Sequence, residues 1–435
     1  MTKKTLIIGG GFTGLTTALR LAQAGGFEIT VVEKASELGG LAAGFNIAGT
    51  SLEKTYHYLF TTDDHVVRLA QELGLAEKLF WADTSNAIFL NGQLHPFTKP
   101  LDVLKFSPCS FLGRLRLGFS ILYLQRCKNW RKFIPVTALA WMRKYAGASA
   151  VETIWEPLLK GKFGAHHDSV SMAWLWARIH SRANSRRDGR EQLGYFRGGF
   201  ESVTCALEKE LRRLGVTIRT GVSVEKLLPA ERAAVINGEK YAYDFCVFTG
   251  PSPAFARLLP ADESLNDYAA QLRSIGYLGA VCLVFTSAQD LGDFYWVNIN
   301  EPDAPFLVFI NHSRLVGKEL YGGKNVYYLG AYLPPDGKIY NLPEAELTKL
   351  WFSYLPKLFS NFNAAKVEEK HIFRFGAAQH IVDTDYEAKI PDFKTPLPGV
   401  FLSNFSQIFP EDRGTNFAVR DGEKIAQLIQ QESAR

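Results

Sequence analysis

The chain has 435 residues, of which 47% are hydrophobic and 13% aromatic, so it can bury a large core and is long enough for two domains. Its net charge of +5 gives no support for a nucleic-acid partner or an acidic tail. The five cysteines show neither C-x-x-C nor Cys/His spacing, which argues against a disulfide framework and a metal site. Without a signal-peptide pattern or an apolar run of ~18 residues, the sequence predicts a cytoplasmic protein, soluble or peripheral on the inner face of a membrane.

A glycine-rich turn joins the first predicted strand, "TLIIG", to the first predicted helix, "TGLTTALRLAQAG". Gly9, Gly11 and Gly14 form the pattern G-x-G-x-x-G. In this pattern the first glycine permits the turn, the second lets the backbone approach a pyrophosphate, and the third lets helix and strand pack closely. Phe12 and Thr13 open the helix, whose free N–H groups favour an anion.

The second predicted strand, "FEITVVEK", supports dinucleotide binding. It ends in Glu33 and Lys34, and Glu33 follows Gly9 by 24 residues, where an acid can accept hydrogen bonds from a ribose. A solvated glutamate at a strand end is the plainer alternative. Gly39 and Gly40 then follow as a pair.

An acid followed by this glycine pair resembles the extended signature of the flavin amine oxidoreductases. That superfamily includes protoporphyrinogen oxidases, phytoene desaturases and monoamine oxidases, with UDP-galactopyranose mutases as relatives. The resemblance implies FAD as the cofactor and a Rossmann-like FAD-binding domain. Many members carry arginine after the glycine pair, where this chain has Leu41, so Leu41 replaces that phosphate contact.

Further resemblances follow in the order of the family. "YFRGGFESVTCALEKELRRLGVTI" resembles the helix that re-enters the FAD domain, and "TGVSVEKLL" implies an adenine contact at Val224. "YDFCVFTGPSP" implies a strand that ends near the cofactor at Thr249. "PGVFLSNFSQIFPEDRGTNFAVRDGEKIAQLIQ" resembles the last strand, loop and helix, and places Asn404, Asn416 and Phe417 beside FAD. Ser403 and Asn404 stand where the family has Gly-Asp, and a capping role for Thr415 or Asn416 is the alternative.

Two residues are candidates for contact with substrate or flavin ring. "LEKTYHYLF" resembles the Asp-x-Gly-x-His pattern at the floor of the ring, with Glu53 as the acid, Thr55 in place of glycine and His57 as the histidine. Arg413 lies in the loop before the last helix. We expect His57 and Arg413 to orient substrate or ring.

The resemblance implies a discontinuous FAD-binding domain (1–79, 195–265 and 395–435) with an inserted α+β substrate-binding domain (80–194 and 266–394). The second insertion contains apolar runs bounded by Pro, Gly and Asn, which predict an antiparallel sheet. We expect its aromatic residues Tyr295, Trp296 and Tyr328 to lie in the core. The first insertion has a helical pattern.

The first insertion is also basic: residues 96–145 contain ten Lys or Arg and one acid, a charge of +9. Residues 106–133 combine this charge with apolar residues, which fits a peripheral membrane contact. A helix buried against its own domain and a region that guides an anionic substrate are the alternatives. Five arginines follow, either in a surface loop or as an anion site: Arg178, Arg182, Arg186, Arg187 and Arg190.

The sequence therefore predicts an FAD-dependent oxidoreductase that dehydrogenates or oxidises a largely apolar or amphipathic small molecule, by hydride transfer to flavin N5. A second dinucleotide motif is not seen, so we expect oxygen, a quinone or another non-nicotinamide acceptor to reoxidise the flavin. The alternatives are a mutase-like, non-redox flavoenzyme acting on a nucleotide sugar, and a protein that holds FAD for structure alone. The oligomeric state is left open.

Overall fold

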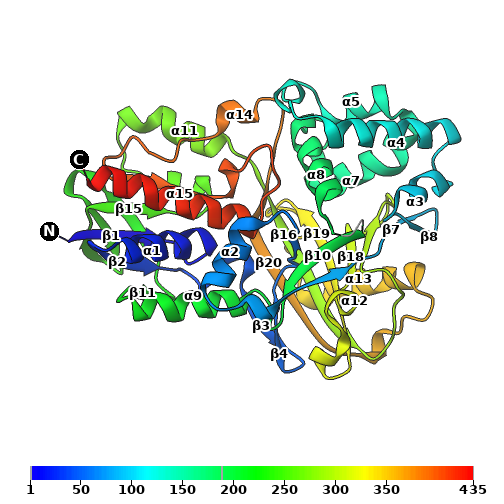
Figure 1. The fold of residues 1–435 in the computed structure, drawn as a ribbon, viewed down its shortest axis with the longest axis horizontal. Helices are drawn as coiled ribbons and strands as arrows, with labels where there is room; N and C mark the ends of the chain where they lie inside the picture. The colour runs from blue at the N-terminus through cyan, green and yellow to red at the C-terminus, as the bar shows by residue number, and fades with distance from the viewer. Residues whose placement is uncertain (1, 188–189, 435) are drawn as a thin grey trace.

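The structure, a computed structural model, describes residues 2–187 and 190–434. Figure 1 shows three parts: a parallel sheet with helices that holds both ends of the chain, a second sheet, and a layer of helices at the end away from the termini. This arrangement confirms the predicted α/β fold class with an inserted α+β region.

The parallel sheet has the strand order β11-β2-β1-β15-β21, with β1 in the centre. Its strands are β1 (Lys3–Ile8), β2 (Phe27–Val32), β11 (Thr217–Arg219), β15 (Phe245–Phe248) and β21 (Val400–Leu402). They all lie within the three ranges predicted for the FAD-binding domain. The associated helices are α1 (Phe12–Ala24), α2 (Asp64–Glu72), α9 (Glu201–Arg213), α10 (Ser252–Ala256), α11 (Asn266–Ser274) and α15 (Thr415–Ser433).

The second sheet has seven strands in the order β20-β16-β19-β18-β17-β7-β8. The predicted antiparallel strands are present, although β17 pairs with β7 in parallel. The strands are β7 (Asn86–Leu90), β8 (Gln93–Pro96), β16 (Tyr277–Ser287), β17 (Trp296–Ile299), β18 (Val308–Asn311), β19 (Asn325–Leu333) and β20 (Val367–His380). Helix α13 (Glu344–Leu358) packs its buried Trp351 and Leu355 in the same core cluster as Phe285 and Phe309 of this sheet.

The first insertion is not wholly helical, as we had predicted, because it begins with β6 (Leu79–Asp83), β7 and β8. β7 and β8 form a hairpin whose turn residues, Asn91 and Gly92, have φ values of +54° and +69°. Asn-Gly is the pair that a tight hairpin turn favours, because both positions need positive φ. This signal was present in the sequence.

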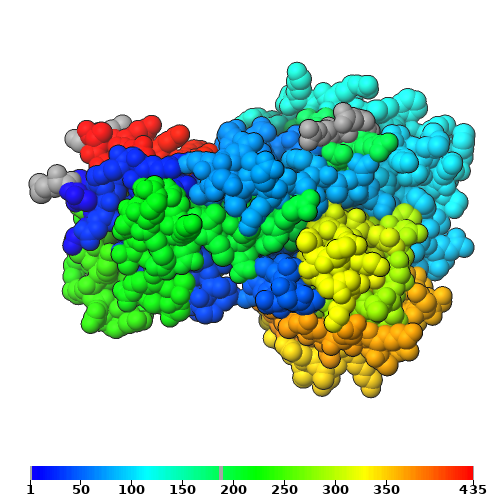
Figure 2. All heavy atoms as spheres, turned by 60° about the horizontal axis from the view of Figure 1, so that its bottom comes forward, coloured from blue at the N-terminus to red at the C-terminus, as the bar shows by residue number. Residues whose placement is uncertain are grey.

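The rest of the first insertion forms the helical layer, whose helices begin at predictable caps. The side chains of Ser110, Thr137 and Ser171 accept hydrogen bonds from backbone N–H groups at the starts of α4, α5 and α8. The layer contains α3 (Pro100–Lys105), α4 (Phe111–Arg126), α5 (Ala138–Tyr145), α6 (Ala148–Ala150), α7 (Glu156–Phe163) and α8 (Met172–Asn184). In the space-filling view this layer, coloured cyan, forms the end of the molecule opposite the parallel sheet (Figure 2).

Smaller elements connect these parts. β10 (Arg190–Phe196) returns the chain toward the parallel sheet and pairs with β6. The others are β3 (Gly44–Ile47), β4 (Thr50–Glu53), β5 (Leu59–Phe60), β9 (Arg186–Arg187), β12 (Val224–Leu228), β13 (Ala233–Ile236), β14 (Glu239–Ala242), α12 (Ser313–Val316) and α14 (Tyr386–Lys389). Within 2–187 and 190–434, every helix is too short or too polar to cross a bilayer.

Candidate active site

The turn between β1 and α1 is closed so tightly that side chains are excluded on one side. A Cβ on Gly9 would lie 2.1 Å from Thr249 Oγ1, and one on Gly14 would lie 2.1 Å from the Gly9 carbonyl oxygen. Gly9 also has a φ of +120°, which L-residues with side chains rarely adopt. These two glycines therefore serve the turn and the packing of helix on strand.

Gly11 is different, because its missing side chain would enter open space. A Cβ there has a single neighbour within 4 Å, the Cα of Gly40 at 3.9 Å. The second glycine pair approaches on the other side, where the Gly39 N–H donates to the Gly10 carbonyl at 2.8 Å. Gly11 is also the N-cap of α1 and leaves the helix without a side-chain cap or an acid in its first turn. A bare helix N-terminus beside two glycine pairs fits a diphosphate.

Glu33 is fixed beside this cradle by the backbone. Its carboxylate accepts hydrogen bonds from the N–H groups of Gly10 and Ala35, each at 2.7 Å. Glu33 and Val224 line the same cavity as Gly9 and Gly11, and Thr249 lines it from the end of β15. A carboxylate held in this way can accept a ribose hydroxyl, as the sequence predicted.

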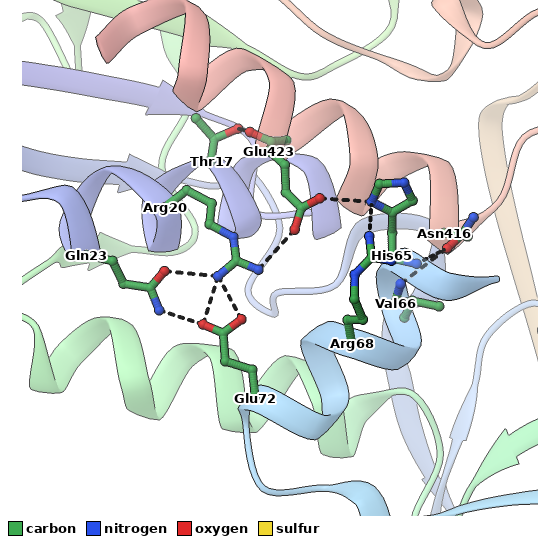
Figure 3. A network of polar contacts seen from close by, with 10 residues as sticks. Thr17, Arg20, Gln23, His65, Val66, Arg68, Glu72, Asn416 and Glu423 are labelled. Carbon is green, nitrogen blue, oxygen red and sulfur yellow. Dashed lines mark hydrogen bonds and ion pairs between the residues drawn. The ribbon is translucent and has the colours of Figure 1, made fainter.

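The N-terminus of α15 closes the far side of the cavity. Gly414 is its N-cap, without a side-chain cap or an acid in the first turn. Asn416 caps a different helix, because its Oδ1 accepts from the N–H groups of His65 and Val66 of α2 at 2.8 and 3.2 Å. Figure 3 shows this contact within a polar network that joins α1, α2 and α15. Asn416 thus leaves the N–H groups of its own helix free to face a ligand.

His57 is a neutral imidazole that borders the cavity. Its Nδ1 lies 2.8 Å from the Thr55 carbonyl oxygen, so Nδ1 carries the proton and Nε2 has the lone pair. Burial lowers the pKa of His57 to about 4. At neutral pH this ring can accept a hydrogen bond but is a poor proton acceptor, which suits an orienting role.

Beyond the ring-facing residues lies a cluster of charged side chains, defined here as Lys162, Arg178, Asp412 and Arg413. Asp412 Oδ2 is 2.8 Å from Lys162 Nζ and 3.1 Å from Arg178 Nη1, and its Oδ1 is 3.5 Å from Arg413 Nη1. Arg413 also donates to the Tyr332 hydroxyl at 2.8 Å and to Gln379. The cluster joins α7, α8 and the loop before α15.

Burial and neighbouring charge shift the pKa values in this cluster. Burial opposes ionisation of Asp412, but the three surrounding cations outweigh it and hold its pKa well below the usual range. Burial, reinforced by Arg178 and Arg413, lowers the pKa of Lys162 to about 7 despite its contact with Asp412.

All of these groups line one continuous cavity of about 1480 Å³. This volume exceeds the 300–1,000 Å³ of ordinary small-molecule sites, so the cavity can hold a dinucleotide and a second molecule. The family model described as flavin containing amine oxidoreductase matches residues 12–427. The chain belongs to the flavin-containing amine oxidoreductase family.

Individual relatives agree with this family. Coproporphyrinogen III oxidase from Staphylococcus aureus is 24% identical over 302 residues, which cover 61% of this chain and 64%, or less than two thirds, of that protein. A structure from Exiguobacterium sp. 255-15, provisionally assigned as a protoporphyrinogen oxidase, has a TM-score of 0.79 at 18% identity and covers 99% of both chains. Reduced UDP-galactopyranose mutase has a TM-score of 0.78 at 13% identity, covering 100% of this chain and 95% of the other. The structural likenesses establish the fold.

Membership of the flavin-containing amine oxidoreductases makes FAD the cofactor, and the glycine cradle, Glu33 and the N-terminus of α15 fit it. Of the residues predicted to contact FAD, Gly14 alone does not line the cavity, since it packs α1 against β1. The others line it: Gly9, Gly11, Phe12, Thr13, Glu33, Lys34, Gly39, Gly40, Leu41, His57, Val224, Thr249, Asn404, Asn416 and Phe417. Which of them touch FAD stays a prediction.

Asn404 lines the cavity, but its side chain is already used. Its amide donates to the Gly250 carbonyl at 2.9 Å and to Ser252 Oγ at 3.2 Å. Its oxygen accepts from the N–H and the hydroxyl of Ser406 at 2.9 and 2.6 Å. All four hydrogen-bonding positions are occupied, so any contact between Asn404 and FAD is left to the backbone.

Two other expectations need correction. Glu53 does not lie at the cavity surface: it is fully buried and accepts hydrogen bonds from the Tyr195 hydroxyl at 2.6 Å and the Phe200 N–H at 2.5 Å. Trp296 is not a core residue, since its ring borders the cavity and packs edge-on against Tyr56 at 5.1 Å. Tyr295 and Tyr328 are buried as predicted.

The cluster contains residues that sequence reasoning missed. Lys162 and Tyr332 belong to no motif, and Lys160, two residues from Lys162, instead pairs with Glu156 on the surface at 2.8 Å. Of the five arginines we had grouped, Arg178 joins the cluster, Arg182 pairs with Glu191 and Arg190 with Asp83. The side chains of Arg186 and Arg187 lie outside the described part of the structure.

Proposed function

We propose that this flavin-containing amine oxidoreductase dehydrogenates or oxidises a largely apolar, membrane-derived small molecule. The observation that carries the proposal is the course of the cavity, which continues past the cluster and between α3 and α4. Its walls there are mostly apolar, and they include Val103, Leu115, Phe119, Ile121 and Leu122. Such a passage suits a hydrocarbon better than a small polar substrate.

When bound, FAD supplies a hydride acceptor at N5, so the substrate loses a hydride and a proton and gains a double bond. Oxygen or a quinone would then take the two electrons. The protein's task is to orient the C–H bond and exclude water. Neutral His57, the ring of Trp296 and Arg413, which Tyr332 and Gln379 hold in place, are the side chains positioned for this task.

We further propose that the helical layer touches a membrane surface through residues 106–133 and the adjoining α3. Eleven large hydrophobic side chains are exposed among the described residues, and eight of them lie between Leu101 and Tyr145. Phe111, Leu112 and Phe119 on α4 are 68%, 64% and 72% exposed. Basic side chains surround them, and a monotopic contact needs both features. Figure 2 shows the layer as a free end of the molecule.

Co-sedimentation with phosphatidylglycerol vesicles tests this contact. The holoprotein should pellet with the vesicles, less so at high salt, and the double variant Phe111→Ser/Phe119→Ser should stay in the supernatant. Leu320→Ser/Ile339→Ser, which removes exposed hydrophobic residues elsewhere, should pellet like the wild type. If both variants pellet alike, α4 is not the contact.

Anaerobic reduction tests the redox function. Coproporphyrinogen III, phytoene and acidic lipids are mixed in turn with the holoprotein, and the visible absorbance of the flavin is followed. One of these classes should bleach the flavin, and air or a quinone should restore the colour. A flavin that dithionite reduces but no member of the panel does would contradict the proposal.

A mutase-like reaction on a nucleotide sugar is the second candidate, favoured by the cations of the cluster, which could bind a diphosphate. It leaves the apolar passage between α3 and α4 without a role. The two functions differ in one measurement, because isomerisation of UDP-galactopyranose would require prior reduction of the flavin and would leave its redox state unchanged.

A further inference from the structure

The cluster carries more positive than negative charge. Within 2–187 and 190–434, Asp412 is the one carboxylate that pairs with Lys162, Arg178 or Arg413. The side chains are largely buried, with exposed fractions of 11% for Lys162 and 16% for Arg413. Buried cations without a counter-charge are costly, so the excess favours binding of an anion.

Asp412 has no capacity left to neutralise these cations. Its Oδ2 contacts Lys162 and Arg178, and its Oδ1 accepts from Trp174 Nε1 at 3.4 Å and faces Arg413. Arg413 in turn is engaged by Gln379 and Tyr332. Lys162 and Arg178 retain N–H groups beyond their contacts with Asp412, and both residues line the cavity. These two side chains are therefore the ones that can donate to an anion.

The cavity connects this charged end to an apolar mouth. Leu104, Phe119 and Leu122 line the cavity and are also 47%, 72% and 44% exposed, so the cavity reaches the surface between α3 and α4. The wall between mouth and cluster includes Leu158 and Ile179. A molecule that fills this space needs an acidic end inside and a hydrocarbon end at the surface.

We propose that the substrate is a single-chain amphiphile with an acidic head group, a carboxylate or a phosphate, whose head is bound by Lys162 and Arg178. Its chain lies between α3 and α4 and reaches the membrane-facing surface. This names the substrate class of the proposed function, yet the binding itself requires no turnover.

Binding to the oxidised holoprotein tests the proposal, with decanoate, decyl phosphate and decanol as probes and calorimetry as the readout. Decanoate or decyl phosphate should bind at least about tenfold more tightly than decanol, since a charged hydrogen bond is lost with the neutral head. The tighter of the two acids identifies the head group. Each methylene added between hexyl and decyl chains should strengthen binding about threefold. Equal binding of decanol, or of inorganic phosphate and decyl phosphate, would overturn the proposal.

Two lysine variants assign the site. Lys162→Met should weaken binding of the acidic probe about tenfold and leave decanol unchanged, whereas Lys162→Arg should retain most of the affinity. Lys160→Met is the matched control on the same helix and should bind like the wild type. If Lys162→Met changes the flavin midpoint potential but not decanoate binding, the cations serve the flavin and the inference is wrong. Tight binding without oxidation of any acidic lipid would contradict the redox function alone.

Discussion

The two ends of the cavity recognise their ligands by different means. At the FAD end, recognition depends on backbone: bare glycines, two helix N-termini and a carboxylate held by two N–H groups. At the inner end it depends on side chains from α7, α8, β19 and the loop before α15. The first arrangement is local in the chain and the second is assembled by the fold. Substitutions should therefore fail in different ways at the two ends.

The largest effects should appear at two glycines of the FAD end. Gly14→Leu places a Cβ 2.1 Å from the Gly9 carbonyl oxygen and should prevent folding, seen as insoluble protein. Gly11→Leu meets no atom within 3.9 Å, so the protein should fold but bind no FAD. The check is the ratio of flavin to protein absorbance after gel filtration. A yellow, soluble Gly11→Leu would show that no diphosphate lies at this turn.

At the inner end, the strongest effect should come from Asp412→Asn. It leaves three buried cations without their counter-charge and should lower the free energy of unfolding by about 3–5 kcal/mol in urea titrations. Asp303→Asn, which breaks an exposed pair with Lys357, should change little. Adding the acidic probe should worsen the loss for neither variant, and if both variants are equally stable, the cluster is more solvated than its burial indicates.

Glu53 provides a buried carboxyl of the opposite kind, because its partners are neutral. Burial raises the pKa of Glu53 to about 7, above the value near 4.5 of an unfolded chain. The folded state thus retains a proton that the unfolded state loses, and stability falls as the pH rises from about 4.5 to 7. Glu53→Gln should remove this slope, worth about 3 kcal/mol at most. Melting curves at pH 5 and 8 check it, with Glu77→Gln on the surface as control; a parallel pH slope in all three proteins would contradict the shift.

The smallest effect should be that of Glu33→Gln, which removes the charge near the ribose position but keeps the shape. FAD should bind about tenfold more weakly in an equilibrium titration of the apoprotein, because a hydrogen bond to a charged group becomes a neutral one. Glu28→Gln lies on the same strand with an exposed side chain and should leave FAD affinity unchanged. Equal affinities would mean that Glu33 serves the turn alone, through Gly10 and Ala35.

These differences also explain what the sequence could predict. The strand, turn and helix around Gly9 to Gly14 are specified within twenty residues, and so are Glu33 and the glycine pair that follows it. Asn416 was harder, because its side chain serves α2, 350 residues away in the sequence. Sequence could place Asn416 at the start of α15 but could not show which helix it caps.

The inner end could not be predicted for the same reason. Lys162 and Lys160 differ in no local feature, and one is buried against Asp412 while the other is exposed with Glu156. Glu53 matched a pattern in spacing, but the aromatic residues Tyr195 and Phe200 enclose it after a long excursion of the chain. Side-chain environments that depend on such distant partners are decided by packing rather than by periodicity.

The position of β1 in the centre of the parallel sheet has a consequence for biosynthesis. Its first neighbour, β2, emerges from the ribosome soon afterwards, but its other neighbour, β15, is more than 230 residues later, and β21 lies later still. Until then one backbone edge of a nascent β1 would be unpaired. Such high contact order favours slow folding, so we expect the newly made chain to depend on chaperones more than its finished fold suggests.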